Sequence, residues 1–413
     1  MATDSLGAAT AGTAELWAYD ADNHMREDID AFPKYMDPAF RERGWRIEPT
    51  DGKDVLWVGQ ESWPDWTWDT ATRPGSFREN LLRMRNGENI DPFRGDQEAV
   101  RIAYRDRDAR LTLMDEQKIQ AELIFNTLAV SRGWMIGGHP AQTYANLRAV
   151  NRYLQAEWGW AYQDRIYAAA LLGLDDLDLA VAELDRLLAE GVRAINLVPG
   201  PVGRRSPADP YFDPFWARVN EANLLLSFHT TPASHIAYRE MFAGWWEPAE
   251  ASVHRGVSDT DSAFMSFQMF NERPIMDTVV ALILHNLFGR FPNIRILSVE
   301  NGTFWVPYTV KLLNKSYAIN QNGFWLGGKP ERPSEVFKRH VFVTPFHEEN
   351  VQSIVDVVGP DCVLFGSDFP HAEGLADPVP DYLSDLEVTD PVAIRKIMRD
   401  NLKGLLEGTA GAS

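Results

Sequence analysis

Three short motifs place metal-binding side chains directly after apolar runs of the sequence. Asp22 and His24 stand two residues apart at the end of the first run, within Asp-Ala-Asp-Asn-His. His229 closes the run Leu-Leu-Leu-Ser-Phe-His, and Asp368 follows Val-Leu-Phe-Gly-Ser. Carboxylates and neutral imidazoles are ordinary ligands of zinc and related ions. These residues therefore predict a site for one divalent metal ion with a coordination position left open for water or substrate.

Each motif also has a structural interpretation. Asp-x-His is typical of a surface turn, a strand-end histidine often bonds to backbone, and Asp368 could cap a helix. In favour of a site, side chains alternate along a strand, so Asp22 and His24 point to the same side. Asp20 shares that side but lies deeper, and we expect it to support the site, with Glu27 as a second hydrogen-bond acceptor.

The elements that must position these residues follow a repeated strand–helix pattern. The helical spacing is clearest over residues 175–191, where Gly191 ends the helix. Repeated units of this kind favour a closed barrel or a doubly wound open sheet. An open sheet would offer a glycine-rich phosphate turn after its first strand, whereas here Asp-Asn-His-Met-Arg-Glu follows. The expected fold is a distorted (β/α)₈ TIM barrel with its chemistry at the carboxyl ends of the strands. The predicted strands are residues 16–22, 119–125, 166–172, 194–198, 224–228, 294–299, 341–344 and 363–366.

Two long stretches interrupt this rhythm, and we interpret them as lid-like insertions into a single domain spanning residues 1–413. Residues 28–108 are polar and rich in tryptophan, and residues 230–273 form the second insertion. Long loops of this kind often cover binding sites. Residues 1–15 are predicted to be a loose tail. The apolar stretch 274–288 predicts a helix pressed against the barrel and against a second subunit or a lid.

The composition limits the partners. A formal net charge of −19 disfavours nucleic acid, and no apolar run is long enough to span a membrane. The single cysteine, Cys362, lies in an apolar run and is expected to be buried, which fits a reducing cytoplasm. We therefore expect a cytoplasmic protein that acts on a small molecule and forms a homo-oligomer.

The sequence resembles the amidohydrolase superfamily, and within it the branch of proteins like aminocarboxymuconate-semialdehyde decarboxylase. The resemblance extends from the first strand to Asn401 and implies a distorted TIM barrel with one divalent metal. It places Asp22 where the family commonly has the first histidine of His-x-His, and matches His24 to the second. His229 matches the strand-five ligand, and Asp368 matches the strand-eight aspartate. The matching segments are residues 20–24, 110–115, 191–194, 290–293, 300–305 and 366–371.

Three positions are distinctive within this resemblance. Asn196 stands where two-metal members often have a modified lysine, which favours a single metal. Glu300 replaces the strand-six histidine, and its role is open between a base, a metal ligand and a backbone partner. Asp22 in place of histidine makes the site harder, so the expected metal is zinc, manganese or iron.

Further candidates lie near the predicted barrel mouth. We predict catalytic roles for Asp368, Glu300 and His371, and substrate contacts for His347 and Asn196. Weaker candidates are His235 and His254 in the second insertion. Arginine could also pair with a substrate anion, the candidates being Arg26, Arg204 and Arg205.

These residues predict a metal-dependent enzyme that carries out non-oxidative decarboxylation, or another C–C cleavage, of a small cyclic carboxylated compound. Asp368 would move the proton. The alternative is hydrolysis of an amide or lactone by metal-activated water, which uses the same ligands. An inactive barrel that serves as a binding scaffold is the alternative of another class.

Overall fold

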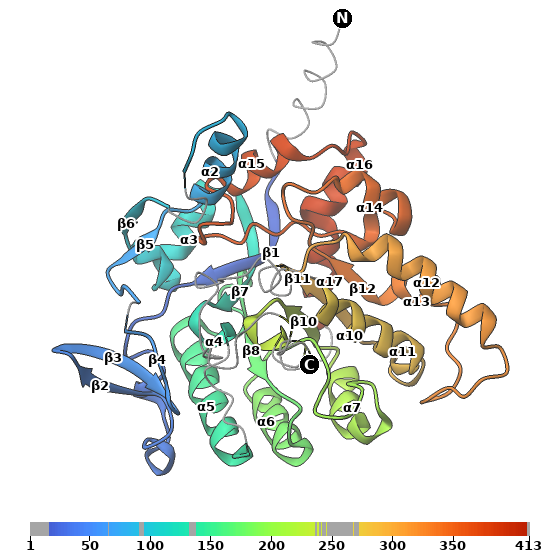
Figure 1. Ribbon diagram of the computed structural model, residues 1–413, viewed down its shortest axis with the longest axis horizontal. Helices are drawn as coiled ribbons and strands as arrows, with labels where there is room; N and C mark the ends of the chain where they lie inside the picture. The colour runs from blue at the N-terminus through green and yellow to red at the C-terminus, as the bar shows by residue number, and fades with distance from the viewer. Residues whose placement is uncertain are drawn as a thin grey trace, which may run out of the picture.

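The computed structural model describes residues 16–410, except 65, 91–94, 132–137 and most of 236–271, where only 238, 241, 245 and 267 are described. Its centre is a curled sheet of parallel strands surrounded by helices (Figure 1). Seven strands follow one another in the order β1-β7-β8-β9-β10-β11-β12. Their bounds are β1 Ala18–Met25, β7 Ile119–Asn126, β8 Ile166–Leu172, β9 Ala194–Leu197, β10 Leu225–His229, β11 Arg295–Val299 and β12 Val341–Val343.

Residues 363–369, here called the closing segment, join the two edges of this sheet. Val363 pairs with Val343 of β12, while the amide of Ala21 in β1 donates to the Phe365 carbonyl at 2.9 Å. The segment is not a regular strand, because the Phe365 amide donates instead to the Ile397 carbonyl at 3.0 Å. The predicted strand 363–366 is thus irregular, but it lies in the eighth position. The distorted TIM barrel is confirmed.

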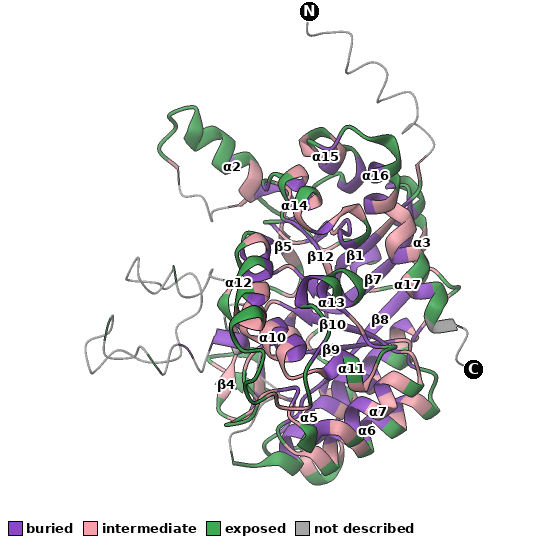
Figure 2. Ribbon diagram, turned by 90° about the vertical axis from the view of Figure 1, so that its right-hand side faces the viewer, coloured by how far each residue is buried: buried purple, intermediate pink, exposed green. Residues whose placement is uncertain are grey.

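Helices cover the outside of the barrel, and buried residues run along the strands beneath them (Figure 2). The predicted helix over 175–191 is observed as α6, Leu177–Ala189, where the Asp176 side chain caps the Leu179 amide at 3.0 Å. The other main helices are α3 Arg107–Glu116, α5 Pro140–Tyr153, α7 Asp213–Glu221, α10 Arg273–Leu284, α12 Trp305–Ile319, α13 Pro333–His340, α14 Val351–Val358, α15 Pro378–Asp385 and α17 Asn401–Ala410. Shorter ones are α4 Leu128–Ser131, α11 Leu287–Arg290 and α16 Pro391–Arg395.

Apolar side chains fill the barrel on both sides of the sheet. Leu123, Leu225 and Leu364 belong to an inner cluster, which Leu402 and Leu406 of α17 join. A larger cluster lies between the strands and the helices. Helix α10 contributes to this outer cluster and packs against α12 and α13, which accounts for its nearly uniform apolar character.

The first insertion forms small elements of its own, which the sequence did not predict. Strands β2 Arg46–Thr50, β3 Lys53–Val58 and β4 Glu61–Ser62 form one antiparallel sheet, β5 Thr70–Thr72 and β6 Gln97–Ala99 pair in another, and α2 is Ser76–Arg85. Trp45 is fully buried, its ring centroid lies 4.7 Å from that of Phe32 in a tilted arrangement, and its indole N–H donates to the Asn146 carbonyl in α5 at 3.2 Å. This tryptophan therefore attaches the insertion to the barrel.

The amide of Phe77 in α2 donates to the Ala372 carbonyl at 3.0 Å, just after the closing segment. Most of the second insertion, including His254, lies outside the described residues. Across the described ranges, no helix has both the length and the apolar character needed to cross a membrane.

Candidate metal centre

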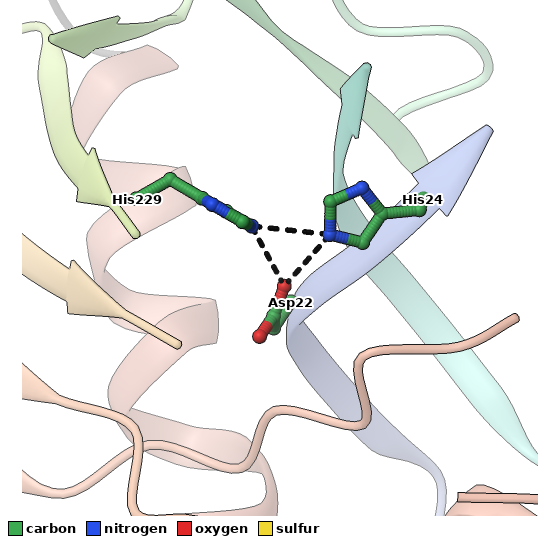
Figure 3. A group of neighbouring side chains, drawn as sticks. All are labelled: Asp22, His24 and His229. Carbon is green, nitrogen blue, oxygen red and sulfur yellow. Dashed lines mark hydrogen bonds and ion pairs between the residues drawn. The ribbon is translucent and has the colours of Figure 1, made fainter. Parts of the chain in front are cut away.

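Three of the four predicted ligands meet at the carboxyl end of the barrel (Figure 3). Asp22 and His24 come from β1, and His229 is the last residue of β10. The Asp22 Oδ1 atom lies 3.5 Å from the Nε2 atoms of both histidines, which are 3.1 Å apart. The Oδ1 of Asp368 joins them, 3.4 Å from His24 Nε2. All four residues are buried.

A bulge in β1 gives Asp22 its place in this group. Asp20 pairs with Glu122 of β7, but Asn23 pairs with Ile124, so β1 has one more residue than its partner over this stretch. Bulges near active sites commonly redirect a side chain. The Asp22 amide turns back to donate to Asp20 Oδ1 at 3.1 Å.

Asp20 connects β1 to the closing segment from beneath the ligands. Its carboxylate accepts from the Ser367 amide at 3.0 Å, the Ser367 hydroxyl at 2.5 Å, and Asn23 Nδ2 at 2.8 Å. Burial raises the pKa of Asp20 to about 7, against the lowering effect of these bonds. Asp20 thus fixes Asp22 relative to the residue before Asp368.

A second buried pair supports β1 from the side of α3. Arg110 is fully buried and bonds Glu122 of β7 through Nε at 3.0 Å. Its Nη2 donates to the His24 carbonyl at 3.2 Å and to the Asn23 side chain. Arg110 lies in one of the segments that resemble the amidohydrolase superfamily, but this contact was not predicted. The sequence did offer one signal for this contact. Arg110 has no obvious partner nearby in the sequence, and the predicted strand that follows it contains a glutamate, Glu122.

The donor atoms fit a divalent cation. His229 Nδ1 lies 2.7 Å from the Thr230 carbonyl, which leaves Nε2 facing the other ligands, as in histidines that bind a metal. Burial lowers the pKa of His24 well below its usual value, which favours the neutral imidazole. The buried Asp22 Oδ1 has no hydrogen-bond partner. Electron pairs that converge without enough protons between them are what a cation site requires.

Asp368 and His371 share a proton. His371 Nδ1 lies 2.7 Å from Asp368 Oδ1, and its Nε2 lies 3.0 Å from Thr127 Oγ1. The Thr127 hydroxyl donates to the Met25 carbonyl at 2.6 Å, so it can only accept from His371. One proton then remains between His371 Nδ1 and Asp368, whose pKa is raised by burial and by the carboxylates of Glu373 and Asp22.

Thr127 was not anticipated from the sequence. It directly follows the last residue of β7, so its position at a strand end was the available signal.

Glu300 also reaches the group. It follows β11 with a φ of 52°, and its amide donates to Thr344 Oγ1 at 3.0 Å. Its Oε2 lies 3.4 Å from His229 Nε2. Burial, with the nearby carboxylates of Asp368 and Asp22, raises the pKa of Glu300 well above its usual value.

Asn196 and His347, the two residues predicted to contact substrate, have different surroundings in the structure. Asn196 is buried, and its Oδ1 accepts from the His229 amide and from Ser227 Oγ, both at 3.1 Å. It therefore holds the strand end that presents His229. His347 lies 3.5 Å from carboxylates of Glu348 and Asp385, and it is not among the ligand groups that converge within the described ranges.

Other candidates bind elsewhere. Glu27 accepts the Leu128 amide at 3.1 Å, at the start of α4. Arg26 donates to the Thr67 and Thr70 carbonyls at 2.5 and 2.8 Å, which attaches the first insertion to the end of β1.

The remaining candidates have these positions. Arg205 pairs with Asp209 at 3.3 Å, and Arg204 is exposed. His235 lies 3.1 Å from the Ser234 hydroxyl.

Comparisons with known proteins agree with this architecture. The family described as amidohydrolase matches residues 66–401, well over half of the chain. A crystal structure of an amidohydrolase from Mycobacterium avium subsp. paratuberculosis K-10 has 30% identity and a TM-score of 0.81, covering 94% of this chain and 97% of that one. No curated protein matches the sequence.

Two decarboxylases share the fold at lower identity. One is dihydroxybenzoic acid decarboxylase from Polaromonas sp. JS666, solved with manganese and 2-nitroresorcinol, at 15% identity and a TM-score of 0.58, covering 94% of this chain and 96% of that one. The other is 5-carboxyvanillate decarboxylase from Sphingomonas paucimobilis, at 17% identity and a TM-score of 0.59, covering 95% and 99%. The match over most of the chain shows that this protein belongs to the amidohydrolase family, as a metal-dependent enzyme of the hydrolase or carboxy-lyase type.

Proposed function

We propose that the protein is a carboxy-lyase that removes carbon dioxide from a small cyclic carboxylated compound without an oxidant. The observation that carries this proposal is the 2.7 Å hydrogen bond between Asp368 Oδ1 and His371 Nδ1 beside the predicted ligands. Decarboxylation leaves an electron pair on carbon, which needs a nearby acid rather than a strong nucleophile. The decarboxylases of similar fold act on dihydroxybenzoate and carboxyvanillate, which are aromatic acids of this kind.

In the proposed mechanism, Asp22, His24, His229 and Asp368 would hold one divalent ion, which would supply Lewis-acid chemistry at a substrate oxygen. The bond between the ring carbon and the carboxylate carbon breaks, and carbon dioxide leaves. The electron pair of the broken bond stays on the ring carbon, and this carbon takes the proton from Asp368. His371, oriented by Thr127, then returns a proton from solvent to Asp368.

Hydrolysis of an amide or lactone is the second candidate, and Glu300 favours it. A buried carboxylate whose pKa is raised is a stronger base and can take a proton from water, and Asp368 can protonate the leaving group. Arg26 and Arg205, two of the cations considered for a substrate carboxylate, bind backbone or another side chain instead. A neutral substrate would not need such a partner.

Product analysis with the metal-loaded enzyme separates the two candidates. We expect carbon dioxide release from one or more of a panel of hydroxybenzoates and related cyclic acids, and none from the Asp368→Asn variant. General acid catalysis contributes about 10²–10⁴-fold, so the loss should be at least of that order. Turnover of lactones or amides with no gas release from any acid would favour hydrolysis. If no substrate is turned over, and Asp368→Asn leaves the biological activity unchanged, the binding-scaffold alternative gains.

A further inference from the structure

Glu300 stands among the predicted metal ligands rather than beside them. Its Oε2 is 3.4 Å from His229 Nε2, much as Asp22 Oδ1 is 3.5 Å from the same atom. Nδ1 of His229 faces the Thr230 carbonyl, which leaves Nε2 facing both carboxylates. A cation bound between these three atoms would interact favourably with all of them.

The spacing of the five side chains fits one ion. Ligands about 2.1 Å from a metal, at angles between octahedral and tetrahedral, lie about 3.0–3.4 Å apart when adjacent. The donor atoms of His24 and His229, of His229 and Glu300, and of His24 and Asp368 are 3.1, 3.4 and 3.4 Å apart. Asp22 Oδ1 is slightly farther from both imidazoles, at 3.5 Å. Oxygens of Asp22, Glu300 and Asp368 also lie within 4.8 Å of one another, so all three can reach the same ion.

Burial supports the same assignment. The side chains of Asp22, Glu300 and Asp368 are only 4%, 17% and 12% exposed, so water screens their mutual repulsion weakly. Asp22 Oδ1 is buried, has no hydrogen-bond partner, and faces into the group. A bound cation would satisfy that oxygen and offset the repulsion among the carboxylates at the same time.

We propose that Glu300 is a fifth protein ligand of the divalent ion and that this fifth donor moves the preference of the centre from Zn²⁺ towards Mn²⁺ or Fe²⁺. Three carboxylates and two imidazoles form a hard, five-donor set, whereas zinc favours four ligands with more nitrogen or sulfur. This inference rests on the metal dependence of the protein and not on its substrate. It assigns Glu300 to the metal, so Glu300 would not be free to act as the base in the hydrolytic candidate.

The test measures metal binding directly. Apo-protein is titrated with MnCl₂ while the electron paramagnetic resonance signal of free Mn²⁺ is followed, and metal content is measured after dialysis against equal Mn²⁺ and Zn²⁺. Wild type should bind about one Mn²⁺ per chain. Glu300→Gln should bind Mn²⁺ at least tenfold more weakly, since even outer-shell partners contribute about 10–100-fold. Its preference should also move towards Zn²⁺.

The matched control is Glu373→Gln. Glu373 is exposed and raises the pKa of both Asp368 and Glu300 through its charge, so the control removes the same charge nearby without removing a ligand. Equal Mn²⁺ affinity in Glu300→Gln and Glu373→Gln would overturn the proposal, as would the same ratio of bound Mn²⁺ to Zn²⁺ in wild type and Glu300→Gln. Circular dichroism of the apo-forms checks that both variants fold.

Activity is scored separately from binding. A Glu300-dependent Mn²⁺ site in a protein that releases no carbon dioxide would leave this inference standing and remove only the proposed carboxy-lyase reaction.

Discussion

The hydroxyl of Thr127 donates its hydrogen to the Met25 carbonyl, so it can only accept a hydrogen bond from Nε2 of His371. Thr127→Val keeps the shape of the side chain but removes that acceptor. We expect kcat to fall roughly tenfold, since a hydrogen bond of this kind contributes about 1.5 kcal/mol. KM should change little, because Thr127 touches His371 and not the predicted ligands.

Thr127→Ser is the control for this prediction, since it restores the hydroxyl. Steady-state kinetics of the two variants on the same substrate makes the comparison. If Ser and Val lower kcat equally, packing rather than the hydrogen bond is what matters at this position.

At the scale of residues, the sequence was informative where chemistry follows a strand. Asp22, His24, His229 and Asp368 were predicted as a group because each ends an apolar run, and the structure brings them together. The contacts of Thr127 and Arg110 were not predictable, because each depends on a partner far away in the chain. His347 also follows a strand, yet it turns towards Asp385, and spacing alone cannot give that direction.

At the scale of secondary-structure elements, the closing segment packs so closely against β1 that no space remains for an added side chain beside Asp22. A Cβ added at Gly366 would lie 2.9 Å from the Asp22 Cβ and 3.2 Å from Thr344 Cγ2. Gly366→Ala should therefore displace Asp22 and destabilise the fold by about 1–3 kcal/mol, as overpacking does. Urea denaturation measures the stability, and metal content measures the ligand geometry.

Gly404→Ala is the matched control in α17. Its added Cβ meets nothing within 4 Å, so alanine should be neutral or stabilising by up to about 1 kcal/mol. Equal stability and metal content for both variants would contradict the steric argument.

The contact between α3 and β7 gives a second prediction for the elements. Arg110→Met leaves Glu122 buried without its partner, which should cost about 3–5 kcal/mol. The double variant Arg110→Met/Glu122→Leu should recover part of that loss, because no buried charge remains. Denaturation midpoints of the two variants check this, and a double variant less stable than the single one would contradict it.

The strands of the barrel were predictable because their apolar runs are long and regularly spaced. The bulge in β1 was not, since it depends on the register with β7 and on the bonds of Asp20. The small sheets of the first insertion were missed because β4 to β6 are short and mostly half exposed, which leaves little alternation to detect.

For the whole molecule, metal binding should be coupled to folding. The predicted ligands come from β1, β10 and the closing segment, so they converge only in the folded chain. A chelator should lower the melting temperature, and metal at 100 times its dissociation constant should restore about 2.7 kcal/mol. Scanning calorimetry with and without chelator measures this, and His24→Ala should show no response. Identical melting curves for wild type would count against the site.

The oligomeric state of the protein and its lack of affinity for nucleic acid stay predictions for the molecule as a whole. We expect a homo-oligomer, which light scattering at several concentrations would detect. The acidic surface, with a net charge of −19, is expected to keep nucleic acid away.

The position of β1 between β7 and the closing segment has a consequence for shortened chains. Residues 66–401 match the amidohydrolase family, but β1 precedes them. A chain cut to that range would retain His229 and Asp368 and lose both Asp22 and His24. It would also expose the unpaired edge of β7, whose backbone groups could pair with another chain. The boundary of recognisable similarity is therefore not expected to be a boundary of the folding unit, and we expect a chain without the first strand to lose the predicted metal site and to associate through β7.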